Sequence, residues 1–105
     1  MRIDIHSKKI ELDELLRTHI ERRLGCAIGR FNEFIRCVTV ELGGRNGNHA
    51  KRCRVRVLLR PTGDAAVEEA GVDLYDVTTR AAGRIGLAVY GELYRMHNSR
   101  RSAAG

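Results

Sequence analysis

Proline is almost absent from this sequence, since Pro61 is the only one in 105 residues. A chain with so little proline and 43% apolar residues can bury a core, which excludes a linker or a disordered segment. No apolar run is long enough to cross a bilayer, and the N-terminus lacks the apolar stretch of a secretion signal. We therefore expect one cytoplasmic domain over residues 1–101, a short disordered tail at 102–105 and no membrane contact.

Cysteine and histidine are too few and too scattered for a metal centre. The cysteines are odd in number and include no CxxC pair, which indicates reduced thiols. The histidines have no metal-ligand spacing with the cysteines or with one another. The residues concerned are Cys26, Cys37, Cys53, His6, His19, His49 and His97. The sequence predicts no metal site and no cofactor.

Catalytic motifs are also missing. Ser7 and Ser99 stand in no GxSxG-type setting, and no Walker-type phosphate loop is present. Gly43, Gly44 and Gly47 fall in a predicted hairpin turn and do not open a helix. We expect the protein to have no enzyme activity.

The last third of the chain carries the clearest helical pattern. Residues 73–101 repeat apolar side chains at steps of three and four, with Asp73 as a suitable N-cap. Its core-facing residues are predicted to be Leu74, Val77, Ala81, Ile85, Ala88 or Val89, Leu93 and Met96. A first helix is predicted from the N-cap Asp13 to about Phe31, with its core side formed by Leu15, Leu16, Ile20, Leu24, Ala27, Ile28 and Phe31.

Alternating apolar and polar residues predict four strands, at 2–6, 35–42, 51–60 and 65–72. Short turns join the last three strands, which therefore form an antiparallel meander. Both helices have one apolar stripe and can cover one face of the sheet, while the other face stays open to solvent. The predicted fold class is α+β: a two-layer sandwich of order β-α-β-β-β-α, with a four-stranded sheet and two helices packed on one face.

Arginine is abundant, and the 19 Lys and Arg against 13 Asp and Glu give a net charge of +6. Arg52, Arg54 and Arg56 alternate along one strand, about 7 Å apart by pleat geometry, which is close to the phosphate spacing of a nucleic-acid strand. Glu41 and Glu68 on the neighbouring strands can point out from the same face and neutralise these arginines instead. The sequence leaves both interpretations open.

The predicted helices carry further cations at Arg22, Arg23, Arg80, Arg84 and Arg95, and Lys8 precedes the first helix. Together with the strand arginines they favour binding to nucleic-acid phosphates. Base-specific readout is not indicated, because aromatic residues make up only 5% of the chain and no stacking pair lies on a strand.

Two stretches resemble the ribosome hibernation promoting factor and ribosome-associated inhibitor family, also called sigma modulation proteins. They are IELDELLRTHIERRLGCAIGRF at 10–31 and VDLYDVTTRAAGRI at 72–85. The first has the family's Ile-Glu-x-x-x-x-Leu-Arg entry at Ile10 and its Arg-Phe exit at Arg30 and Phe31, and the second its acidic-aliphatic-Tyr helix start at Asp73. The resemblance covers about Met1 to Arg95, and also includes the second predicted strand through Val38, Val40 and Leu42.

The resemblance implies binding to the small ribosomal subunit, in the channel of mRNA and tRNA, and inhibition of translation under stress. It also implies contacts between rRNA phosphates and basic residues, which at matching positions are Arg22, Arg23, Arg80, Arg84 and Lys8. The length resembles that of the short members, which lack a C-terminal dimerisation extension.

The second helix departs from the family after Arg84, where further basic or glutamine residues are usual. Here Leu87, Tyr90 and Tyr94 fall on one line off the core stripe, beside small glycines. An exposed stripe of this kind favours a homodimer or partner contact, and a helix that is buried over a wider arc is the competing interpretation. The alternative function is therefore a non-catalytic protein–protein module that kept the fold and lost ribosome binding.

Overall fold

The elements follow the predicted order β-α-β-β-β-α. The structure, a computed structural model, describes residues 1–44 and 50–104, with side chains up to Asn98. The elements are β1 (Ile3–Ser7), α1 (Glu14–Ile28), a 3-10 helix η1 (Gly29–Phe34), β2 (Ile35–Gly44), β3 (Lys51–Leu59), β4 (Asp64–Gly71) and α2 (Leu74–Ala104). Residues 45–49 of the predicted turn, with His49, lie outside the described part, as does Gly105 at the end of the predicted tail.

Within the described residues the strands form one sheet in the order β1-β2-β3-β4. The meander of β2, β3 and β4 is antiparallel, as predicted, and β1 joins the other side of β2 in parallel. One register row crosses all the strands and faces the helices: Ile5, Val40, Val55 and Val67. The period-two pattern of the strands is therefore explained by burial of alternate residues on one side.

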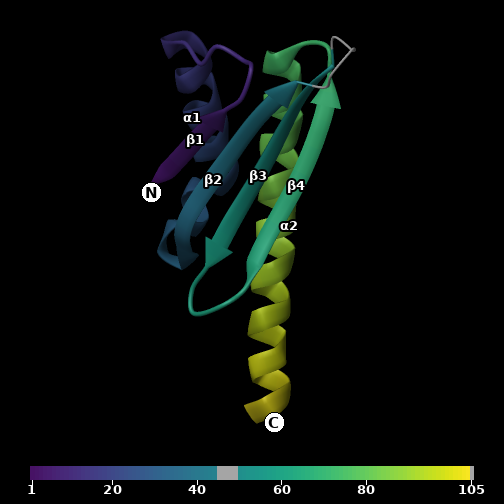
Figure 1. The fold of residues 1–105 in the computed structure, drawn as a ribbon. Helices are drawn as coiled ribbons and strands as arrows, with labels where there is room; N and C mark the ends of the chain where they lie inside the picture. Colours follow the sequence, from purple (N-terminus) through teal and green to yellow (C-terminus); the bar gives the residue numbers. More distant parts are fainter. Residues whose placement is uncertain (45–49, 105) are drawn as a thin grey trace.

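Figure 1 shows the two layers, with α1 and α2 on the same face of the sheet. The opposite face of the sheet has no element of the described chain over it. The C-terminal part of α2 continues beyond the end of the sheet (Figure 1), and its last helical residue, Ala104, lies past the predicted end at Arg101. The α+β sandwich with two helices on one face is confirmed.

Helix α1 begins as predicted, because Asp13 Oδ1 accepts a hydrogen bond of 2.8 Å from the backbone N–H of Leu16. Its buried row follows the four-residue step and consists of Leu16, Ile20, Leu24 and Ile28. The prediction for Leu15 was wrong: this side chain is 75% exposed. A neighbour one residue away is rotated by about 100° on a helix, so Leu15 turns off the row that Leu16 occupies.

The predicted end of the first helix at Phe31 was also wrong. Helix α1 ends at Ile28, and the six residues Gly29–Phe34 continue as the tighter helix η1. Glycine at positions 25 and 29 lowers the helix propensity of this end, which explains the early change of helix type. Phe31 still packs against the core from η1, although it is only partly buried.

Helix α2 is capped by Asp73, whose Oδ1 accepts from the N–H of Tyr75 at 3.0 Å. The predicted stripe is buried through the first half of the helix, and Leu93 near its end is partly buried. The buried members are Leu74, Val77, Ala81, Ile85 and Val89. Burial decreases toward the C-terminus because α2 continues beyond the ends of the strands on which it packs (Figure 1).

The two helices run side by side in the same direction and approach closely at Gly86. His19 of α1 lies 3.1 Å from Thr79 Oγ1, and Ala27, further along α1, lies against Gly86, further along α2. A β-carbon added at Gly86 would lie only 3.1 Å from the carbonyl oxygen of Ala27. Glycine at this position is therefore what lets the helices pack at this distance.

Candidate nucleic-acid interface

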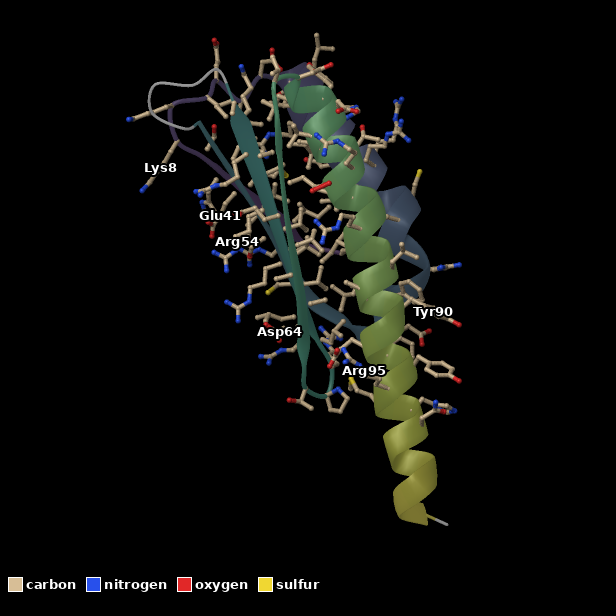
Figure 2. The ribbon with its side chains drawn as sticks, turned by 90° about the vertical axis from the view of Figure 1, so that its right-hand side faces the viewer. Lys8, Glu41, Arg54, Asp64, Tyr90 and Arg95 are labelled. Carbon is tan, nitrogen blue, oxygen red and sulfur yellow. The ribbon has the colours of Figure 1, made fainter. Side chains whose placement is uncertain are left out.

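The open face of the sheet carries the predicted arginine stripe. Arg52, Arg54 and Arg56 of β3 are exposed, while the residues between them are buried, as the alternation predicted. In Figure 2, Arg54 projects from the sheet on the side away from the helices, together with Glu41 and Asp64.

Carboxylates balance most of this stripe. Arg52 Nε lies 3.5 Å from Glu68 Oε1, and Arg56 Nη2 lies 3.2 Å from an Asp64 carboxylate oxygen. Arg54 stands in register between Glu41 and Glu68, but no carboxylate of the described residues comes within 4.0 Å of it. The cross-strand pairing that the sequence left open is thus present for Arg52, and β4 also supplies Asp64 to Arg56.

Lys8 lies where the stripe meets the loop after β1. It lines an open hollow of about 1060 Å³ together with Arg52, Glu41 and Gly43. Figure 2 shows Lys8 projecting from the upper end of the molecule on the open side of the sheet. Lys8, which precedes the first helix as expected, therefore lines the same hollow as Arg52 on this face.

Arg80 and Arg84 form a link between α2 and the outer strand β4. Both reach Glu69, at 3.2 Å to one carboxylate oxygen each, and the Glu69 side chain is only 19% exposed. Arg80 also donates to the carbonyl oxygen of Ala70 at 3.1 Å, and Arg84 to that of Glu68 at 3.1 Å. These guanidinium groups are held by the protein itself, on the side of α2 that faces β4.

Arg95 is further along α2. Its guanidinium group contacts Glu92 one turn earlier, and Figure 2 places it on the sheet side of the helix, opposite to Tyr90. Arg80, Arg84 and Arg95 therefore do not converge with Arg22 and Arg23, which belong to α1.

The cations of α1 have a different environment. Arg22 and Arg23 are exposed and lie off the buried row of this helix. Across the part of the chain that the structure describes, neither has a carboxylate within 4.0 Å. Arg30, in η1, stacks its guanidinium group over Phe31 with 4.7 Å between the guanidinium carbon and the ring centroid. These arginines can meet an anion without first breaking an ion pair.

The tyrosine stripe of α2 is exposed, which agrees with one of the two interpretations that the sequence left open and not with a helix buried over a wider arc. Leu87, Tyr90 and Tyr94 are 76%, 53% and 58% exposed. The rings of Tyr90 and Tyr94 are stacked with centroids 6.3 Å apart and planes inclined by 22°. The ring centroid of Phe31 in η1 lies 6.3 Å from that of Tyr90, so the aromatic surface includes a residue predicted to face the core.

No group of three potential metal ligands occurs among the described residues. Cys26, Cys37 and Cys53 are free thiols that are exposed, half-buried and buried in that order. Burial raises the pKa of the Cys53 thiol to about 12. The thiolate form is therefore disfavoured at this core position.

The thiols are expected to react in the order of their exposure. With a disulfide reagent such as dithionitrobenzoate at pH 8, Cys26 should be modified first and Cys53 only after unfolding, because the thiolate is the reacting form. Peptide mass spectrometry at successive times measures this order. Modification of Cys53 as fast as Cys26 in the folded protein would contradict the packing of β3 described above, and a Cys26→Ser variant provides the control by removing the first phase.

No helix in the described part of the chain combines the length and the apolar composition needed to cross a membrane.

The arrangement of the helices and strands defines the class of the protein, which is a two-layer α+β domain. Solved structures share this fold. The N-terminal domain of Protein Y from Thermus thermophilus matches with a TM-score of 0.71 and 26% sequence identity, over 83% of this chain and 93% of that chain. A ribosomal subunit interface protein from Coxiella burnetii matches with a TM-score of 0.72 over 91% of this chain and 99% of that chain. At 16% identity, this second likeness shows the fold alone.

The sequence adds the family. The family model described as sigma 54 modulation protein / S30EA ribosomal protein matches residues 3–87. The chain belongs to this family, so the resemblance seen in the helix-entry and helix-start motifs is confirmed. A comparison with curated proteins gave no significant match.

Proposed function

We propose that this protein is a non-catalytic translation inhibitor of the ribosome hibernation class, which binds the small ribosomal subunit through contacts to rRNA phosphates. Membership of the S30EA family and the likeness to a Protein Y domain support ribosome association. The net charge of +6 supports a polyanionic partner. The protein would act in the cytoplasm, where it regulates translation under stress.

The observation that carries the rRNA contact is the unpaired state of the α1 arginines. A guanidinium group that already binds a carboxylate must lose that partner before it binds a phosphate, whereas Arg22 and Arg23 have no such partner in the described chain. We therefore assign the main phosphate contacts to Arg22 and Arg23. Arg54 and Lys8 can add a second contact from the open sheet face, while weaker contributions come from the paired residues Arg52, Arg56, Arg80, Arg84 and Arg95.

Charge reversal on α1 tests this proposal. We expect the wild-type protein to co-sediment with purified small subunits at about 50 mM salt and to lose most binding at about 200 mM, because each phosphate contact releases counterions. The double variant Arg22→Glu/Arg23→Glu should bind at least about tenfold more weakly at low salt. Its salt dependence should also be shallower, since two contacts are missing.

A matched control reverses the same number of charges away from Arg22 and Arg23. Arg36 in β2 and Arg60 after β3 are both exposed, and Arg36→Glu/Arg60→Glu alters the net charge by the same four units as the α1 variant. If the control weakens binding as much as the α1 variant, the effect is one of net charge and the assignment of Arg22 and Arg23 fails. Absence of wild-type binding at either salt would overturn the proposed function itself.

The exposure of Leu87, Tyr90 and Tyr94 favours the alternative function, a protein–protein module of the same fold. Such a module would show no salt-dependent binding to subunits, and a homodimer through α2 would be its simplest form. The co-sedimentation experiment and the sedimentation mass of the free protein distinguish these two functions.

A further inference from the structure

We propose that Phe31, Tyr90 and Tyr94, here called the aromatic row, form a stacking surface for unpaired bases of RNA. This inference rests on the proposed function and deepens it: phosphates would meet the arginines of α1 and η1, and bases would lie on the rings. The RNA would therefore be single-stranded where it crosses α2, since bases in a duplex have no free faces.

The geometry of the row suits stacking. Tyr90 and Tyr94 are separated by one helical turn, with nearly parallel rings whose centroids are 6.3 Å apart. Both side chains are more than half exposed, so their rings can be reached from solvent. Phe31 extends the row toward α1, 6.3 Å from Tyr90. Base–aromatic stacking tolerates any sequence, because every base has a π face.

A cation stands at the start of the row. Arg30 lies over Phe31, 4.7 Å from the ring centroid. A ring with a guanidinium group beside it combines stacking with phosphate attraction, which is the usual composition of a single-strand binding surface. The row lies on η1 and α2, so the lack of a stacking pair on the strands does not exclude base stacking here.

The surrounding charges favour RNA over a second copy of this chain. In a two-fold dimer through the row, Arg30, whose guanidinium group lies over Phe31, would be brought close to its own copy and would repel it. The carboxylate of Glu92, near the row in sequence, is already in contact with Arg95. An anionic partner would be attracted instead of repelled. Among the described residues, no carboxylate lies within 4.0 Å of Arg22, Arg23 or Arg30, so their charge is not neutralised by an ion pair.

The test uses the full chain and a labelled twelve-nucleotide oligoadenylate, either single-stranded or paired to its complement, at about 50 mM salt. Fluorescence anisotropy should show that the wild type prefers the single strand. In Tyr90→Leu/Tyr94→Leu, affinity for the single strand should fall at least about tenfold, within the range expected for the loss of stacked bases. Affinity for the duplex and the salt dependence should stay unchanged.

Two control variants test whether the rings of the row, and not any tyrosine or its hydroxyl group, are responsible for binding. Tyr90→Phe/Tyr94→Phe keeps both rings and should retain single-strand binding. Tyr75→Leu removes the tyrosine near His19 at the start of α2, away from the row, and should change nothing. Circular dichroism should show the same helix content in all variants, and the single variant Tyr94→Leu serves if the double variant unfolds.

The outcomes that overturn the proposal are specific. Equal single-strand affinity for the wild type and the leucine variant would exclude stacking, even where subunit binding persists. A wild-type dimer that becomes a monomer in the leucine variant would assign the row to self-association. The variant Arg22→Glu/Arg23→Glu should lower single-strand and duplex binding alike, so failure of the phosphate contacts is distinguishable from failure of stacking. Absence of any wild-type binding to the single strand would also overturn it.

Discussion

Replacing Ile85 by alanine is expected to lower the free energy of unfolding by about 2–5 kcal/mol. Ile85 is fully buried in the middle of α2, where the helix lies against the sheet. Truncation removes buried methyl and methylene groups and leaves a cavity. The helix and the sheet around this cavity are closely packed and can relax only partly to fill it. Urea unfolding followed by circular dichroism measures the change, since a single domain of this size is expected to unfold in one step.

Leu87 supplies a control on the same helix, two residues away. Its side chain is 76% exposed, so Leu87→Ala should change the free energy of unfolding by no more than about 0.5 kcal/mol. A large loss in this control would mean that Leu87 is covered in solution, which points to a partner or a second copy over that face. A small loss in Ile85→Ala would contradict the packing of α2 on the sheet.

Replacing Gly86 by valine should lower the free energy of unfolding by about 2–3 kcal/mol. A β-carbon at this position would stand 3.1 Å from the carbonyl oxygen and 3.3 Å from the β-carbon of Ala27. The first of these atoms belongs to the backbone, so the strain cannot be relieved by turning a side chain. The helices must separate, and the aromatic contact between Phe31 and Tyr90 should loosen with them. The thermal unfolding midpoint and the denaturant midpoint both report this loss.

Gly83, one turn earlier in α2, is a control position, because the same substitution there brings no contact like that between Gly86 and Ala27. A β-carbon there would meet no atom within 4 Å, and valine has a slightly better helix propensity than glycine. The variant Gly83→Val is therefore expected to be neutral or slightly stabilising. If Gly83→Val and Gly86→Val lose equal stability, the cost comes from valine in the helix and the close approach of α1 and α2 is not its cause.

Much of the fold follows from periodicity in the sequence. The strand residues Val40, Val55 and Val67 alternate with polar ones, so their shared side of the sheet was predictable before their register was known. The caps at Asp13 and Asp73 were predictable from the chemistry of their carboxylates. The parallel pairing of β1 was not, because a strand of five residues has no local signal for its neighbour.

The candidate site was less predictable, because its charges depend on contacts between distant segments. The sequence showed that Arg80 and Arg84 lie on one side of a helix, but their link to Glu69 depends on how α2 crosses β4. Helical spacing placed Tyr90 off the core stripe, but it left open whether the ring was exposed or buried over a wider arc. The proximity of Tyr90 to Phe31 did not follow from the sequence, since it depends on how η1 and α2, far apart in the chain, lie relative to each other.

The contacts of Arg80 and Arg84 with the backbone have a consequence for solubility. β4 is an outer strand, and an outer strand offers free carbonyl and amide groups to which another chain can add. The carbonyl oxygens of Glu68 and Ala70 accept hydrogen bonds from these two guanidinium groups. An approaching strand would have to displace two bonded cations before it could pair with this edge. Helix α2 thus hinders edge-to-edge pairing at β4 with the same two residues that link the helix to this strand.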